Sequence, residues 1–229
     1  TFKEVQAKAI NLGLDLKGGM NVMLQVQLED LVKALAGDNN APEFTNALAL
    51  AKEVVKFDPL NYYATNELVL MGAKPAAEFA KLLRGVPESH LELAMYYYNN
   101  GFTSDAKAVL MASEAAKPYP TVEYWLGYLA DAEGNADLAR SWFKKAESED
   151  IDYVFPFRLE TIAALDKALE YLPQSHNTWY YLGNLYYHKQ PEKALAAWEK
   201  AVEAKPDFAM ALRNLGWYWR FKNENKAKD

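Results

Sequence analysis

The sequence predicts a mainly α-helical protein in which antiparallel helix pairs stack into an α-solenoid, with a small β-hairpin segment near the N-terminus. From about residue 44 onward it is rich in Ala and Leu and is interrupted at short intervals by Pro, Gly and Asn, which is typical of short consecutive helices. The pair Leu-Gly recurs within this helical part, which indicates internal repeats. Residues 10–28 instead alternate apolar and polar side chains, which predicts strands. We therefore expect an αβ segment over 1–43 and a helical repeat domain over 44–229.

The composition is that of a folded protein, and it excludes several function classes. With 229 residues, 51% hydrophobic and 14% aromatic, the chain has enough apolar surface to offset the entropy of ordering. The net charge is −6 and no basic run is longer than Lys144-Lys145, which argues against a nucleic-acid partner. The absence of cysteine excludes disulfides and cysteine-ligated zinc but does not select a cytoplasmic or a periplasmic compartment.

Targeting and membrane signals are not found in this sequence. No apolar run approaches the roughly 18 residues that a spanning helix needs. The first residues, TFKEVQAK, lack the apolar stretch of a signal peptide. We therefore expect no membrane span in this chain.

The alternating segment predicts a hairpin with a three-residue loop at 17–19. A two-residue Gly-Gly turn would place Leu14 opposite Met23 and would separate the apolar rows onto opposite faces. The three-residue loop brings all apolar groups onto one face and pairs Leu16 with Met20, Leu14 with Val22, Leu12 with Leu24 and Ile10 with Val26. An isolated hairpin is marginal in water, so a helix at about 28–36, the helical array or a larger sheet must cover that face.

The repeats of the helical part share a spacing of small and bulky residues. Leu-Gly occurs at 126–127, 182–183 and 215–216, and the last two copies are 33 residues apart. Downstream of the first two copies come a small residue, a large apolar residue four positions later and a small residue three positions after that. These are Ala139, Phe143 and Ala146 in one unit and Ala194, Trp198 and Ala201 in the next. Such spacing places small groups where two helices touch closely.

This spacing resembles the tetratricopeptide repeat, whose pattern is W-x2-L-G-x2-Y followed by Ala, an aromatic residue, Ala and Pro. The fullest copy is formed by Trp179, Leu182, Gly183, Tyr186, Ala194, Trp198, Ala201 and Pro206. The unit at Leu126 has Glu123 in the leading place, and roughly one extra helix follows it before the next unit. The resemblance implies a non-catalytic scaffold for protein or peptide binding.

The resemblance also implies a binding surface, because in this family the first helix of each pair lines the concave face. The positions concerned lie two before the Leu, directly after the Gly and four after the Gly. In this sequence they are Tyr124, Tyr128, Asp131, Tyr180, Asn184, Tyr187, Arg213, Trp217 and Arg220. Tyr, Trp, Asn and Arg offer flat apolar contact and directional hydrogen bonds, which suit extended peptides and also stack on sugars. The alternative interpretation is that the curvature of the solenoid buries these side chains against one another.

No motif for catalysis, metal binding or a cofactor stands out. The three histidines, His90, His176 and His188, are never three or four residues apart, and no His-Glu-x-x-His or G-x-S-x-G pattern exists. Gly13 and Gly18 have the spacing of a phosphate loop, but the Lys-Ser/Thr that must follow is missing. We expect no catalytic residue, no metal site and no cofactor, and we do not expect an enzyme.

Two further resemblances supply alternative functions. The segment 12–26, LGLDLKGGMNVMLQV, resembles the opening of the first periplasmic domain of SecD of the bacterial Sec translocase, and a weaker match extends over about 2–53. It implies a translocase-associated module in protein transport at the inner membrane. The segments DPLNYYATNEL and DYVFPFRLE resemble the tetratricopeptide tails of carbohydrate-associated bacterial proteins. It implies carbohydrate-linked binding or an accessory tail of a carbohydrate-active protein.

Overall fold

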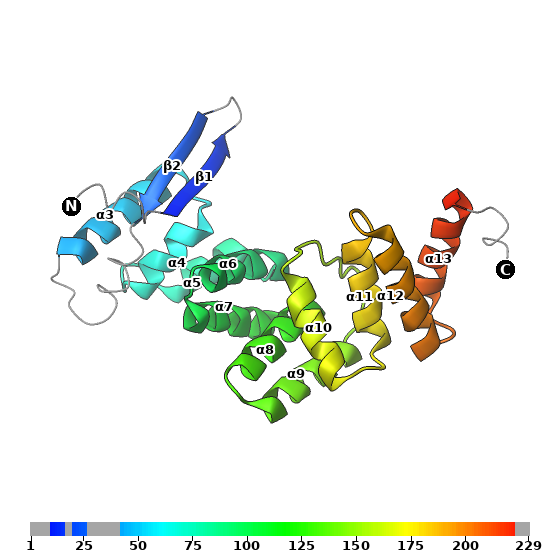
Figure 1. Ribbon diagram of the computed structural model, residues 1–229. Helices are drawn as coiled ribbons and strands as arrows, with labels where there is room; N and C mark the ends of the chain where they lie inside the picture. The colour runs from blue at the N-terminus through cyan, green and yellow to red at the C-terminus, as the bar shows by residue number, and fades with distance from the viewer. Residues whose placement is uncertain (1–9, 17–19, 27–41, 223–229) are drawn as a thin grey trace, which may run out of the picture. The chain divides into compact units, whose positions relative to one another are not determined.

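The computed structural model describes residues 10–16, 20–26 and 42–222 (Figure 1). These residues hold eleven helices and one two-stranded sheet, so the chain is mainly helical, as the sequence predicts. They form two compact units that divide between Arg84 and Gly85. The boundary expected between residues 43 and 44 lies inside the first unit, so the first three helices fall on the N-terminal side of the division.

The strands of the first unit form an antiparallel hairpin. Strand β1 is Ile10–Leu16 and strand β2 is Met20–Val26. Leu16 lies opposite Met20 and Ile10 lies opposite Val26. The helix expected at 28–36 to cover the hairpin lies outside the described residues, so the cover stays a prediction.

The first unit also contains three helices that follow one another along the chain. They are α3 (Pro42–Phe57), α4 (Tyr62–Leu70) and α5 (Ala76–Leu83). Helix α3 buries side chains three or four residues apart, namely Phe44, Ala47, Ala51 and Val54. Helix α4 begins after Asn61, whose side-chain oxygen accepts a hydrogen bond from the Ala64 amide at 2.9 Å.

The second unit is a series of eight helices. They are α6 (Pro87–Asn99), α7 (Thr103–Ala116), α8 (Pro120–Ala132), α9 (Ala136–Ser148), α10 (Thr161–Tyr171), α11 (His176–Tyr186), α12 (Pro191–Ala204) and α13 (Ala209–Lys222). Proline begins α6, α8 and α12, because its fixed φ suits the first helical position. The turns inside the first two pairs contain Gly101 and Gly134 at φ +85° and +79°, which glycine adopts without strain.

The packing inside each pair follows the predicted small-residue contacts. Helix α6 packs mainly on α7, α8 on α9, and α11 on α12. A Cβ on Gly127 would lie 2.4 Å from the Phe143 ring, and a Cβ on Gly183 would lie 2.3 Å from the Trp198 ring. Both glycines therefore allow a close approach that any side chain would prevent. The alanines on either side of the two rings, Ala139, Ala146, Ala194 and Ala201, are fully buried.

An extra helix and an irregular segment interrupt the series between α9 and α11. Helix α10 packs on α8, α9 and α11 and is the additional helix that the sequence predicts. Residues 151–160, which we call the strap, precede it without regular structure. The strap exposes large apolar side chains, namely Tyr153, Phe155, Phe157 and Leu159. The regular stacking of helix pairs is therefore broken at this point.

Candidate functional site

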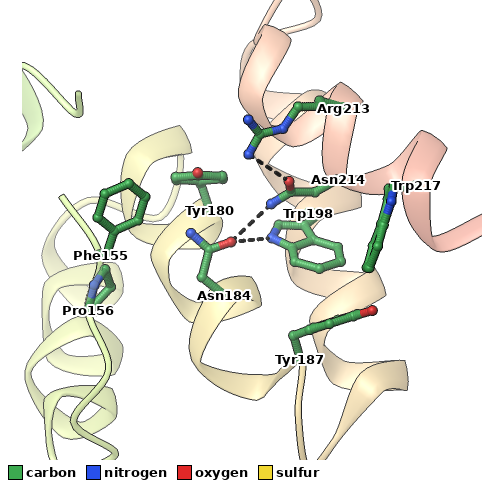
Figure 2. Close-up of a pocket in the computed structure, with 9 residues that line it drawn as sticks. All are labelled: Phe155, Pro156, Tyr180, Asn184, Tyr187, Trp198, Arg213, Asn214 and Trp217. Atoms are coloured by element: carbon green, nitrogen blue, oxygen red, sulfur yellow. Dashed lines mark hydrogen bonds between the residues drawn. The ribbon is translucent and has the colours of Figure 1, made fainter. Parts of the chain in front are cut away.

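The candidate site is a pocket with a volume of about 540 Å³ in the second unit, formed by α11, α12, α13 and the strap (Figure 2). Five of its nine lining residues are positions that the sequence predicts for the concave face. These are Tyr180, Asn184, Tyr187, Arg213 and Trp217. The other four are Phe155, Pro156, Trp198 and Asn214.

Polar side chains form a connected series along one wall of the pocket. Arg213 Nη2 donates to Asn214 Oδ1 at 3.3 Å, and Asn214 Nδ2 donates to Asn184 Oδ1 at 3.0 Å. Trp198 Nε1 donates to the same Asn184 oxygen at 3.2 Å. Because an indole N–H can only donate, the atom that faces it must be the amide oxygen of Asn184. The orientation of Asn184 is therefore determined by its neighbours.

This orientation leaves the amide nitrogen of Asn184 available to a ligand. Among the residues that the structure describes, Asn184 Nδ2 has no hydrogen-bond partner, and Figure 2 shows it pointing away from Trp198 toward the side of the pocket where Phe155 lies. An amide nitrogen carries two donor hydrogens. The wall therefore offers the two amide hydrogens of Asn184, in a fixed orientation, to a ligand in the pocket.

Aromatic rings form the other surfaces of the pocket. The Tyr187 ring lies 5.6 Å from that of Trp198 and 6.1 Å from that of Trp217, measured between ring centroids. Trp217 is 53% exposed, whereas Tyr180 is only 2% exposed and packs edge-on against Phe208. Phe155 of the strap stands on the opposite side in Figure 2. Tyr180 thus supports the floor, while Trp217 and Phe155 are open to contact.

The charge of the pocket favours a ligand rich in acceptors. Its nine lining residues include Arg213 and no carboxylate. Arginine binds carboxylates with paired, charge-assisted hydrogen bonds. Together with the aromatic faces, this arrangement can hold a segment that carries an acidic or carbonyl group beside an apolar side chain.

Two of the other predicted residues are used in packing. Tyr124 is 1% exposed, its hydroxyl lies 2.8 Å from Thr178 Oγ1, and burial raises the pKa of its phenol. Tyr128 is half-buried and accepts a hydrogen bond from the Tyr98 hydroxyl at 3.3 Å. That bond, with burial, raises the pKa of Tyr98 to about 12. Neither Tyr124 nor Tyr128 lines the pocket.

Asp131 and Arg220 also lie apart from the pocket. The Tyr171 hydroxyl of α10 donates to Asp131 Oδ1 at 2.5 Å, and Lys167 Nζ of the same helix lies 3.5 Å from Asp131 Oδ2. Side chains of α10 therefore bind Asp131, which the repeat pattern would leave free to contact a ligand. Arg220 is exposed on α13, about two turns beyond Arg213.

Four lining residues are not among the predicted site residues. Phe155 and Pro156 lie in the strap, which has no repeat pattern that would place them. Trp198 has the spacing of a packing residue, and it does pack on Gly183, but its indole nitrogen also orients Asn184. Asn214 could have been noticed as a polar residue on α13 beside Arg213.

A cluster of charged side chains from α7, α8 and α9 lies away from the pocket. Lys145 Nζ contacts a carboxylate oxygen of Glu114 and lies 3.3 Å from Glu123 Oε1. Glu123 is fully buried, and burial, followed by the charges of Glu114 and Glu149, raises its pKa to about 7. The two carboxylates are therefore buried, whereas the side chain of Lys145 is 39% exposed.

Neither a metal-binding cluster nor a helix able to span a membrane occurs among the residues that the structure describes. In the parts of the chain covered by the structure, no three His, Cys, Asp or Glu side chains gather as a metal site. Over the same residues, every helix is too short or too polar to cross a membrane.

The second unit is an array of paired helices with a pocket between α11, α12, α13 and the strap. The tetratricopeptide-repeat family model matches residues 91–153 and 185–227, so these parts of the chain contain tetratricopeptide repeats. The SecD subunit of the protein translocase of Rhodothermus marinus is 42% identical over 53 residues, which are 23% of this chain and 8% of that protein. The chain therefore matches only a small part of that relative.

Several solved structures are similar at low sequence identity. MamA of Desulfovibrio magneticus RS-1, from residue 41 to its end, is 17% identical, with 80% of this chain and 86% of that chain covered and a TM-score of 0.31. Human IFIT1, solved as a dimer with m7Gppp-AAAA, is 18% identical over 87% of this chain and 47% of that chain, with a TM-score of 0.30. YrrB, described as a tetratricopeptide-repeat protein with an unusual peptide-binding site, is 17% identical over 80% and 96%, with a TM-score of 0.29.

Proposed function

We propose that this chain is a non-catalytic scaffold that holds an extended peptide segment of a partner protein in the pocket between α11, α13 and the strap. The observation that supports the proposal best is that five inner-face positions taken from the repeat pattern line this one pocket. Their side chains combine exposed aromatic faces with donors whose orientation is determined by neighbours.

The hydrogen-bonding groups suggest how a peptide would be held. Asn184 Nδ2 would donate to a backbone carbonyl, since an extended peptide presents such acceptors along its length. Arg213 would pair with a carboxylate of the ligand, from an acidic side chain or a C-terminus. These contacts set the direction and register of the segment.

The aromatic groups suggest what gives the affinity. A pocket lined by Trp217, Tyr187 and Phe155 would take one apolar or aromatic side chain of the ligand, because buried aromatic anchors supply most of the binding energy in such interfaces. The preferred ligand is therefore an acidic peptide with one large apolar residue.

A selection from a library of short random peptides tests the proposal. Peptides enriched on the wild-type chain are measured by isothermal titration against Trp217→Ala and Asn184→Ala. We expect each substitution to weaken binding at least about tenfold, as the loss of a central contact does. Tyr153→Ala is the matched control, because Tyr153 is an aromatic residue of the strap that is 85% exposed and does not line the pocket.

Two outcomes would contradict the proposal. One is enrichment of peptides that bind both variants as tightly as the wild type. The other is a glycan array that gives a signal sensitive to Trp217→Ala while the peptide library gives none, since flat aromatic rings also stack on sugars. In the second case the chain would belong to the carbohydrate-binding class.

A further inference from the structure

A turn at the start of the strap presents an exposed aromatic ring. The Val154 amide donates to the Ile151 carbonyl at 3.1 Å, and Val154 is 3% exposed, so a buried side chain anchors the turn. Tyr153 has a φ of +63°, a region that favours glycine, and its side chain is 85% exposed. A glycine would fit this turn with less strain. Packing within the chain therefore does not explain why a tyrosine stands there.

Two carboxylates accompany this ring. Asp150 and Asp152 are exposed, and neither pairs with a lysine or arginine among the residues that the structure describes. Asp150 Oδ1 accepts a hydrogen bond from the Asp152 amide at 2.9 Å, whereas the Asp152 carboxylate has no hydrogen-bond partner in the same parts of the chain. We call residues 150–153 the Tyr153 turn. It is an acidic segment with one large, exposed aromatic side chain.

The pocket carries the opposite charge. Arg213 is exposed and hydrogen-bonds to Asn214, and no carboxylate is among the nine lining residues. The ligand that suits this pocket is an acidic segment with one large apolar side chain, and the Tyr153 turn has both features. Arginine and carboxylates form paired, charge-assisted hydrogen bonds. The surface of the chain therefore includes a segment that is complementary to its own pocket.

The turn lies outside the pocket of its own chain. Phe155 and Pro156 line that pocket, whereas Tyr153, only two residues before Phe155, does not. Moving Tyr153 into the pocket would require Val154 to leave its buried position and Phe155 to leave the pocket wall. A second copy of the chain can supply the turn without either change.

We propose that two copies of this chain form a two-fold dimer in which each copy inserts its Tyr153 turn into the pocket of the other. Because the turn and the pocket border each other along the strap, one two-fold axis makes both contacts at once, and the assembly closes at two copies. In each contact the Tyr153 ring packs on Trp217 of the other copy, and Asp152 pairs with Arg213. The inference rests on the proposed function, since it names the segment that the pocket holds.

Charge reversal gives a test that is specific to this reciprocal contact. Arg213→Glu brings two carboxylates together, and Asp152→Arg brings two guanidinium groups together, so each variant alone should dimerise at least about tenfold more weakly than wild type. In a mixture of the two variants, the introduced carboxylate of one chain faces the introduced guanidinium of the other. The native Arg213 and Asp152 face each other in the second contact. The mixture should therefore dimerise as tightly as wild type.

Sedimentation equilibrium over a series of chain concentrations measures these dissociation constants. Glu199→Arg is the matched control, because Glu199 is an exposed carboxylate on α12 that does not line the pocket, and it should leave the dimer unchanged. Added salt should weaken the wild-type dimer, since the Asp152–Arg213 contact is screened. Circular dichroism of both charge variants confirms that they fold.

Tyr153→Gly separates binding from folding. Glycine adopts the positive φ without strain, so this variant should resist urea at least as well as wild type. It should still dimerise at least about tenfold more weakly, because the aromatic side chain that enters the pocket is lost. A peptide selected on the pocket should dissociate the wild-type dimer by competition. On the monomer, the affinity of the pocket for that peptide does not depend on Tyr153.

Three results would overturn the inference. A wild-type chain that stays monomeric at its highest soluble concentration while selected peptides bind the pocket would do so and leave the proposed function standing. A dimer that neither Arg213→Glu nor Tyr153→Gly weakens would be formed by another surface. A mixture of the two charge variants that stays monomeric would show that Asp152 and Arg213 do not meet. Absence of both a dimer and peptide binding would overturn the proposed function as well.

Discussion

The helix pairs α8–α9 and α11–α12 place a glycine of the first helix on an aromatic ring of the second, Gly127 on Phe143 and Gly183 on Trp198. They differ in the residue one turn before that glycine. In α8 it is Glu123, which lies 3.3 Å from Lys145, and in α11 it is Trp179, whose ring lies 4.0 Å from Lys200. The same lysine position thus serves an ion pair in one unit and a cation–π contact in the other.

The inner faces of the two pairs differ more strongly. The inner residues of α8 are covered: Tyr124 is buried beside Thr178, and Asp131 is bonded to Tyr171 of α10. Those of α11, Asn184 and Tyr187, line an open pocket. The repeat pattern therefore determines how a pair packs internally. The elements outside the repeat decide whether its inner face is covered.

The largest effect should come from breaking the ion pair of α8–α9. Lys145→Met leaves the buried carboxylates of Glu123 and Glu114 without the partly exposed lysine that neutralises them, and we expect a loss of about 3 kcal/mol in the free energy of unfolding. Lys200→Met removes only the contact with Trp179 and should cost about 0.5–1 kcal/mol. Chemical denaturation of the two variants measures the difference. Equal losses would show that the two lysine contacts are equivalent after all.

The next largest effect on the free energy of unfolding is expected from alanine substitutions at the three Leu-Gly glycines. Gly127→Ala and Gly183→Ala push a Cβ into the facing ring and should each cost about 1–3 kcal/mol. Gly216→Ala meets no described atom, so the higher helix propensity of alanine should instead stabilise the chain by up to about 1 kcal/mol. Thermal and urea unfolding report the sign. Destabilisation by all three would mean that Gly216 is covered in solution.

A smaller effect concerns pH and separates α8–α9 from α11–α12. Because the pKa of Glu123 is raised from 4.5 to about 7 in the folded chain, the folded state binds the proton more tightly than the unfolded state. The contribution of Glu123 to stability is therefore present at low pH and is lost as pH rises from about 4.5 through about 7.

The measurement is urea denaturation across that pH range for wild type and Glu123→Gln. The wild-type free energy of unfolding should fall more steeply with rising pH than that of the variant. Parallel pH profiles would show that Glu123 does not change its protonation within this window. Glu199→Gln, an exposed position on α12, is the control.

The internal packing of the pairs could be predicted from the sequence because it depends on contacts within one repeat. Ala194, Trp198 and Ala201 are spaced to meet Gly183 whatever surrounds the pair. Whether the inner face of a pair is covered or open could not be predicted in the same way. Tyr171 and Lys167 cover Asp131 only because α10 folds back on α8, and nothing in the spacing of α8 reports that.

The pocket shows the same division between local and long-range information. Asn184, Tyr187, Arg213 and Trp217 lie together because α11 and α13 occupy equivalent places one repeat apart. Phe155 and Pro156 join them from the strap, whose path depends on packing far along the chain. Arg213, Trp217 and Arg220 are equivalent predictions of the repeat pattern. The sequence therefore does not show that Arg213 and Trp217 line the pocket while Arg220 lies beyond it.

The most direct test of an inner face that is open at α11–α13 and closed at α8 is a ¹⁵N NMR titration with a peptide selected on the wild-type chain. The account predicts that the Asn184 side-chain amide and the Trp217 indole shift, while the backbone amides of Tyr124, Tyr128 and Asp131 stay unchanged. Shifts concentrated on α8, with Asn184 unaffected, would contradict it.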